Sequence, residues 1–138
     1  KVPQPILDAF NENGWTFVID GNYTANLSRQ LGVNCIGATV FGENRIYVSE
    51  SGATLHEFGH FYDSLLGFPE EHDRLYELEA ANAPMSEHAK SSSLEYFAEF
   101  FAYWCSGNPR TLTLLKELTP ETYAYFEGLS AAWLSEKQ

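Results

Sequence analysis

Apolar positions follow two spacings along this 138-residue chain, and the balance between them changes near residue 50. In the first part, short runs of alternating apolar residues are typical of strands, whereas later apolar residues recur every three or four positions, as on one face of a helix. Glycine, asparagine and proline mark the ends of these segments. The pattern predicts strands over 15–19, 33–41 and 45–49 and helices over 5–13, 24–31, 53–66, 70–82 and 93–106, with further helices that open at 109 and 120.

Strands that come first and helices that follow them are typical of an α+β fold. We therefore expect one domain over residues 1–138, with a small N-terminal mixed sheet and a helical C-terminal half. A chain of this length buries roughly two thirds of its unfolded surface, and an apolar content of 44% argues against disorder.

The helix predicted over 53–66 carries the most informative motif, His56-Glu57-Phe58-Gly59-His60. Residues four apart share a helix face, so the two imidazoles can bind one metal ion while Glu57 takes a proton from a metal-bound water. The alternative is a helix with two half-exposed histidines that bind nothing. Because glycine costs a helix roughly 1 kcal/mol relative to alanine, we expect another backbone to approach closely at Gly59.

A catalytic zinc site holds three protein ligands and keeps a fourth position open, so a third ligand is expected downstream. Glu95 and Glu99 lie one helical turn apart among apolar residues, and buried carboxylates need partners. One carboxylate can bind the metal while the other accepts the free ring N–H of a ligand histidine. Alternatively, Ser92 and Glu95 form a capping box, and Glu99 pairs with an arginine.

The segments 56–60 and 95–99 together resemble the catalytic domain of the anthrax toxin lethal factor family, whose relatives include secreted Pro-Pro endopeptidases. The resemblance is best over residues 45–105. It implies a zincin-like metallopeptidase of the gluzincin type that binds Zn²⁺ through His56, His60 and Glu95. It also implies that Glu99 supports a ligand histidine, and that Asp63 supports either the ligands or the helix.

The family carries a tyrosine seven residues before the third ligand, and its hydroxyl stabilises the oxyanion of the tetrahedral intermediate. This chain has His88 at that position. A protonated imidazole can donate to an oxyanion as a phenol does, so His88 is a candidate catalytic residue. The alternative is that His88 is a surface residue and that Tyr76 or another tyrosine performs this task.

The strand predicted over 45–49 leads directly into the metal-binding helix. Zinc peptidases of this design hold an extended substrate against an edge strand, because backbone pairing aligns a peptide whatever its sequence. The strand, or the hairpin before it, is therefore a candidate substrate site; an ordinary interior strand is the alternative. The residues concerned are Arg45, Ile46, Tyr47 and Val48.

These observations favour a zinc-dependent endopeptidase with Glu57 as general base. The alternative is a catalytically degenerate, zinc-containing binding or structural module, which a fourth protein ligand such as His72 or His88 would favour. The intact Glu57 argues against this alternative, because a structural zinc site has no need of a base.

The composition of the chain limits the classes of partner that it can bind. A formal net charge of −11 with 8 basic residues disfavours nucleic acid, and no apolar run reaches the ~20 residues that span a bilayer. We expect a monomer that acts on a peptide or protein. The chain begins with Lys1 rather than methionine, which indicates a processed or trimmed fragment, and the resemblance favours secretion. Cys35 and Cys105 form either one bridge or two buried thiols.

Overall fold

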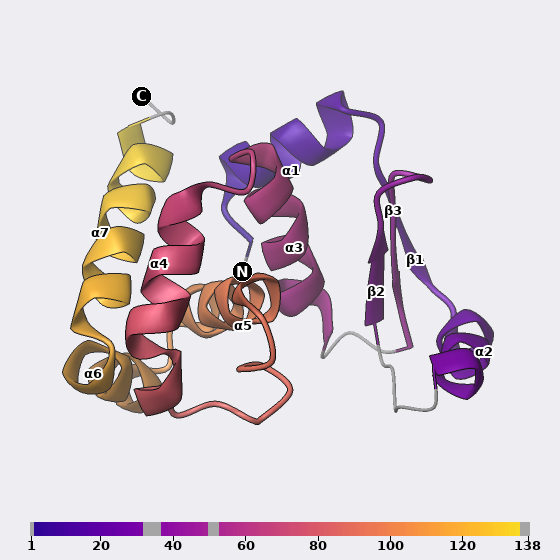
Figure 1. The fold of residues 1–138 in the computed structure, drawn as a ribbon. Coiled ribbons are helices and arrows are strands. Elements are labelled where there is room, and N and C mark those ends of the chain that lie inside the picture. The colour runs from indigo at the N-terminus through magenta and orange to yellow at the C-terminus, as the bar shows by residue number, and fades with distance from the viewer. Residues whose placement is uncertain (1, 32–36, 50–52, 136–138) are drawn as a thin grey trace.

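The computed structural model describes residues 2–31, 37–49 and 53–135 and has an α+β fold that is mostly helical (Figure 1). The N-terminal part contains α1 (Gln4–Glu12), β1 (Thr16–Ile19), α2 (Gly21–Leu31), β2 (Gly37–Val40) and β3 (Arg45–Val48). The rest contains α3 (Thr54–Leu65), α4 (Glu70–Glu79), the 3₁₀ turn η2 (Ala80–Asn82), α5 (Ser93–Ser106), α6 (Pro109–Leu118) and α7 (Pro120–Ser135). The predicted order of elements is confirmed, although positions 33–36 of the second predicted strand lie outside the described residues.

The described strands form a mixed sheet in the order β1-β3-β2, with β1 parallel and β2 antiparallel to β3. The segment 45–48 is therefore the central strand, and Ile46 and Val48 are fully buried. The prediction that Arg45, Ile46, Tyr47 and Val48 form an edge strand is wrong, because both sides of β3 already pair with other strands. The alternative, an interior strand, is confirmed, and the argument for substrate binding at these residues loses its basis. The other predicted candidate, the preceding hairpin, places β2 at an edge of the described sheet, next to α3.

The two faces of the sheet are covered by different helices, as the alternation of β3 requires. Ile46 and Val48 join the core cluster that includes Phe58 of α3. Tyr47 points to the other face, where its ring stacks on Tyr23 of α2 at 3.8 Å between centroids. The sheet thus lies between α2 and α3 (Figure 1).

Helices α3 and α5 pack closely against each other, and Gly59 makes this possible. A Cβ atom at Gly59 would lie 2.7 Å from Cα of Ala98, closer than real Cβ atoms come to backbone. The expected close backbone approach at Gly59 is confirmed. It brings the histidines of α3 opposite the carboxylates of α5.

Local capping signals start two of the C-terminal helices. Ser92 accepts a hydrogen bond from the backbone N–H of Glu95 at the start of α5. Asn108 accepts bonds from the first-turn amides of α6, as is typical of asparagine before a proline at the first helical position.

The start of α7 is stabilised differently. Its first amides, of Glu121 and Thr122, donate to the buried carboxylate of Glu79 at 3.0 and 2.7 Å. Thr119, the residue before Pro120, donates its hydroxyl to the carbonyl of Leu115. A side chain of α4 therefore caps α7.

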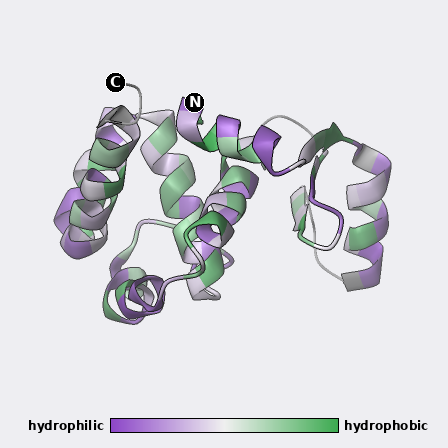
Figure 2. Ribbon diagram, turned by 90° about the horizontal axis from the view of Figure 1, so that it is seen from above, coloured by the Kyte–Doolittle hydropathy of each residue, from purple (hydrophilic) through white to green (hydrophobic). Residues whose placement is uncertain are grey.

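Hydropathy varies around most helices, with hydrophilic and hydrophobic stretches interleaved along each ribbon (Figure 2). This pattern is typical of amphipathic helices that bury one face in a common core. Within residues 2–31, 37–49 and 53–135, no helix combines the length and the apolarity needed to cross a bilayer.

Candidate metal centre

His56 and His60 of α3 converge on one carboxylate of α5. His56 Nε2 lies 2.9 Å from Glu95 Oε2, and His60 Nε2 lies 3.3 Å from Glu95 Oε1. The donor atoms of His56, Glu57 and His60 also lie within 4.8 Å of one another. The structure thus brings the two predicted histidine ligands and the predicted third ligand together.

Glu95 takes part in its helix start through the backbone rather than the side chain. Its N–H donates to Ser92, but its carboxylate faces the two histidines. Burial alone would raise the pKa of Glu95, yet the hydrogen bonds and charges of His56 and His60 lower it well below its usual range. The carboxylate is therefore ionised and able to bind a cation.

Glu99 contacts the other ring nitrogen of His56, with 3.3 Å between Oε1 and Nδ1. A neutral His56 with its proton on Nδ1 donates to Glu99 and presents the Nε2 lone pair to a metal. Burial lowers the pKa of His56, but the bonds to Glu95 and Glu99 outweigh it and raise the pKa to about 10. A metal that binds at Nε2 must therefore displace the proton that His56 shares with Glu95.

Glu57 is 6% exposed and lies beside the histidines. Burial raises its pKa, while His60, His56 and a hydrogen bond from Thr39 act in the opposite direction. That bond joins Thr39 Oγ1 of β2 to Glu57 Oε1 at 2.8 Å. The sequence gives no sign of this contact, because it joins residues 18 positions apart on different elements.

His88 lies at the rim of the site. Its Nε2 is 3.4 Å from Glu95 Oε2, and its side chain is 77% exposed. Tyr76, the alternative, donates its hydroxyl to the carbonyl of Lys90 at 2.5 Å. Of these two candidates, His88 is the one that contacts the predicted ligands.

Asp63 and His72 form a separate buried pair. Asp63 Oδ1 lies 2.8 Å from His72 Nδ1, and His72 Nε2 lies 2.8 Å from the hydroxyl of Tyr125. Of the two predicted roles of Asp63, support of its helix is the one this contact favours. Both ring nitrogens of His72 have partners, so the suggestion that His72 is a fourth metal ligand is wrong.

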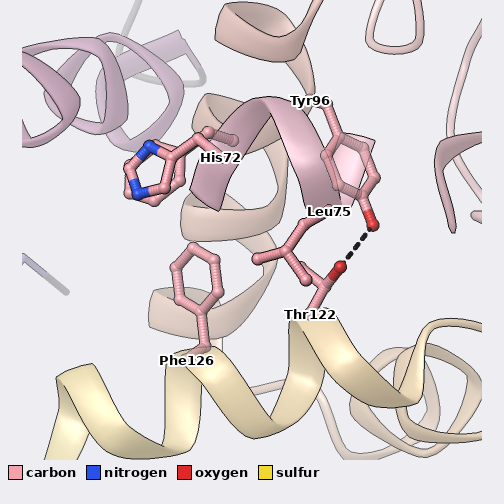
Figure 3. Close-up of a pocket in the computed structure, with 6 residues that line it drawn as sticks. His72, Leu75, Tyr96, Thr122 and Phe126 are labelled. Atoms are coloured by element: carbon pink, nitrogen blue, oxygen red, sulfur yellow. Dashed lines mark hydrogen bonds between the residues drawn. The ribbon is translucent and has the colours of Figure 1, made fainter. Parts of the chain in front are cut away.

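A cavity of about 10 Å³ adjoins this pair (Figure 3). It lies among α4, α5 and α7, and the hydroxyls of Tyr96 and Thr122 are hydrogen-bonded at its edge. Its volume suits a single water molecule, so it is a packing defect of the core rather than a substrate site. The lining residues are His72, Leu75, Tyr96, Phe97, Thr122 and Phe126.

A known protein family matches most of this chain. The family model described as "Anthrax toxin lethal factor, N- and C-terminal domain" matches residues 22–129, more than half of the chain. The chain belongs to this family. No curated protein matches the chain.

The lethal factor family assignment covers every residue of the candidate centre, since Thr39, the 56–60 motif, His88, Glu95 and Glu99 all lie within 22–129. The donor set suits zinc, since two imidazoles and one carboxylate are a recurrent catalytic combination. One carboxylate of Glu95 faces both imidazoles, with a different oxygen near each ring.

Proposed function

We propose that this lethal factor family member is a zinc-dependent endopeptidase with a zincin-like catalytic domain. In this proposal His56, His60 and Glu95 hold the zinc, and Glu57 is the general base. The observation that carries the proposal is the convergence of both histidines on Glu95, beside a buried Glu57. When bound, the zinc supplies a Lewis acid that makes a water molecule acidic near neutral pH.

The side chains divide the proton transfers between them. Glu57 takes a proton from the attacking water and passes it to the leaving amine nitrogen, which leaves the carboxylate as it began. His88 donates an N–H to the carbonyl oxygen as negative charge develops there. Its exposed position at the rim suits a group that meets substrate. Glu99 holds His56 in the orientation that presents Nε2 to the metal.

The substrate is proposed to be an extended peptide or protein segment that pairs with β2. This strand lies at an edge of the described sheet and packs beside α3, the arrangement that strand addition requires. The net charge of −11 favours encounters with basic segments. A secreted, monomeric enzyme remains our expectation.

The test compares the native chain with Glu57→Gln, using Glu117→Gln on the exposed side of α6 as the control. Zinc content is measured by mass spectrometry, and hydrolysis is measured on a mixed peptide library with and without chelator. We expect about one zinc per chain in all three proteins and peptide cleavage in all but Glu57→Gln. Full cleavage by Glu57→Gln would refute the mechanism.

The approach of His88 to Glu95 favours one other candidate, a zinc-containing binding module in which His88 is a fourth ligand. His88→Ala separates the two. If His88 is an oxyanion donor, the substitution lowers kcat and leaves zinc affinity unchanged. If His88 is a fourth ligand, the substitution lowers zinc affinity.

A further inference from the structure

Strand β2 presents two residues to the carboxylate of Glu57. Residues two apart on a strand point to the same face, and Thr39 and Gly37 both face Glu57. Each of them contacts or adjoins a different carboxylate oxygen.

Thr39 binds the first oxygen. Its hydroxyl lies 2.8 Å from Glu57 Oε1 and 3.1 Å from the backbone carbonyl of Glu57. The single hydroxyl proton thus has acceptors on both the side chain and the backbone of the same residue. A bond to an ionised carboxylate is short and strong, and burial of Glu57 limits competition from water.

Gly37 leaves space at the second oxygen. A Cβ atom at this position would lie 2.9 Å from Glu57 Oε2 and 3.0 Å from its Cγ. Any side chain there would push the carboxylate away from the strand. Gly37 therefore leaves the space that the Glu57 carboxylate occupies.

We infer that Thr39 and Gly37 are positioning residues that hold the Glu57 carboxylate against β2, so that Oε2 is the oxygen that moves the proton and the carboxylate does not bind the metal. This inference rests on the proposed function. Glu57 needs such restraint, because it has an oxygen within 4.8 Å of the donor nitrogens of His56 and His60. Once released, the carboxylate can reach the metal and close the position that a catalytic site keeps open.

The test uses Co²⁺ alone as the probe, because its visible spectrum reports the number and type of its ligands. Thr39→Val removes the hydroxyl but keeps the shape and suits a strand, while Thr39→Ser keeps the hydroxyl. We expect an altered Co²⁺ spectrum for Thr39→Val and Gly37→Ala and a native spectrum for Thr39→Ser. Gly42→Ala is the matched glycine control, because a Cβ at this position meets nothing within 4 Å. Its Co²⁺ spectrum should also match that of the native chain.

A double variant links the change to Glu57 itself. In the Glu57→Gln background, Thr39→Val should no longer change the spectrum, since no carboxylate remains to move. A native chain that binds no Co²⁺ would overturn the metal centre and this inference with it. A native spectrum that Thr39→Val leaves unchanged would overturn the inference alone.

Kinetics on any peptide that the native chain cleaves give a second measurement. Thr39→Val should lower kcat at least tenfold with KM within about twofold, because the base is misplaced while peptide binding is kept. Thr39→Ser should restore kcat to within about threefold of native. Equal losses in the two variants would show that Thr39 serves only to pack the strand.

Discussion

Gly59 of α3 lies directly against the backbone of Ala98 in α5. A Cβ atom added to Gly59 would be 2.7 Å from Cα of Ala98. Gly59 lies between His56 and His60, and Ala98 lies between Glu95 and Glu99. The contact that packs the two helices therefore also sets the distance between the predicted ligands. Packing and metal binding depend on the same residues.

Gly59→Ala should damage both properties. The added methyl group meets backbone, which cannot rotate away, so the helices must separate and the free energy of unfolding should fall by about 1–3 kcal/mol. Urea unfolding and zinc content measure the two effects. Gly128→Ala in α7 is the control, because its Cβ meets nothing within 4 Å, and it should be neutral or stabilising by up to about 1 kcal/mol. Similar stability for both variants would contradict the role given to Gly59.

Glu95 and Glu99 should differ in their effect on zinc. Glu95 faces both histidines, whereas Glu99 lies beside the far nitrogen of His56. Glu95→Ala should therefore lose stoichiometric zinc, and Glu99→Ala should bind it about 10–100-fold more weakly. Titration with a competing chelator measures both. The reverse order of affinities would exchange the two assignments.

His72→Phe should destabilise the fold without touching the metal centre. Phenylalanine keeps the stack on Phe97, whose ring centroid is 4.1 Å away, but leaves the carboxylate of Asp63 buried without its partner. Within the described residues Asp63 Oδ2 already has no hydrogen bond. Removing one partner of a buried pair costs about 3–5 kcal/mol, measurable by urea unfolding at pH 7.

The double variant Asp63→Leu/His72→Phe separates the pair from its packing. Replacing both partners by apolar groups should recover most of the lost stability. Zinc content should stay native in both variants. If the free energy of unfolding of His72→Phe lies within about 1 kcal/mol of the native value, the carboxylate of Asp63 has found another partner.

Cys105 should resist alkylation in the folded protein. Burial raises the pKa of its thiol to about 12, whereas an unfolded cysteine has a pKa near 8.5. In a Cys35→Ser background, iodoacetamide at pH 8.5 should react at least about 100-fold more slowly with folded than with unfolded protein, because only the thiolate reacts. The folded rate should keep rising up to pH 11 while the unfolded rate levels off. Equal rates at pH 8.5 would mean that the thiol is not buried.

Features encoded within a few residues could be predicted from the sequence. Helix starts at Ser92 and Asn108 follow from side chains that bond to amides two or three positions ahead. The grouping of His56, His60 and Glu95 was predictable because each segment forms a helix with a known spacing. The resemblance then paired the two helices.

Features that depend on which elements become neighbours could not be predicted. Alternation identifies 45–48 as a strand, but a central and an edge strand alternate alike, so the sequence left both positions open. Thr39 meets Glu57, and Asp63 meets His72, across different elements. A short polar side chain carries no local sign of its distant partner.

The cap that Glu79 provides makes the start of α7 conditional on a helix more than 40 residues earlier in the chain. If α4 undocks, the amides of Glu121 and Thr122 lose their acceptor and exchange with solvent. Hydrogen exchange at the amides of Glu121 and Thr122 therefore reports whether α4 is docked against α7. The first turn of α7 therefore depends on the docking of α4.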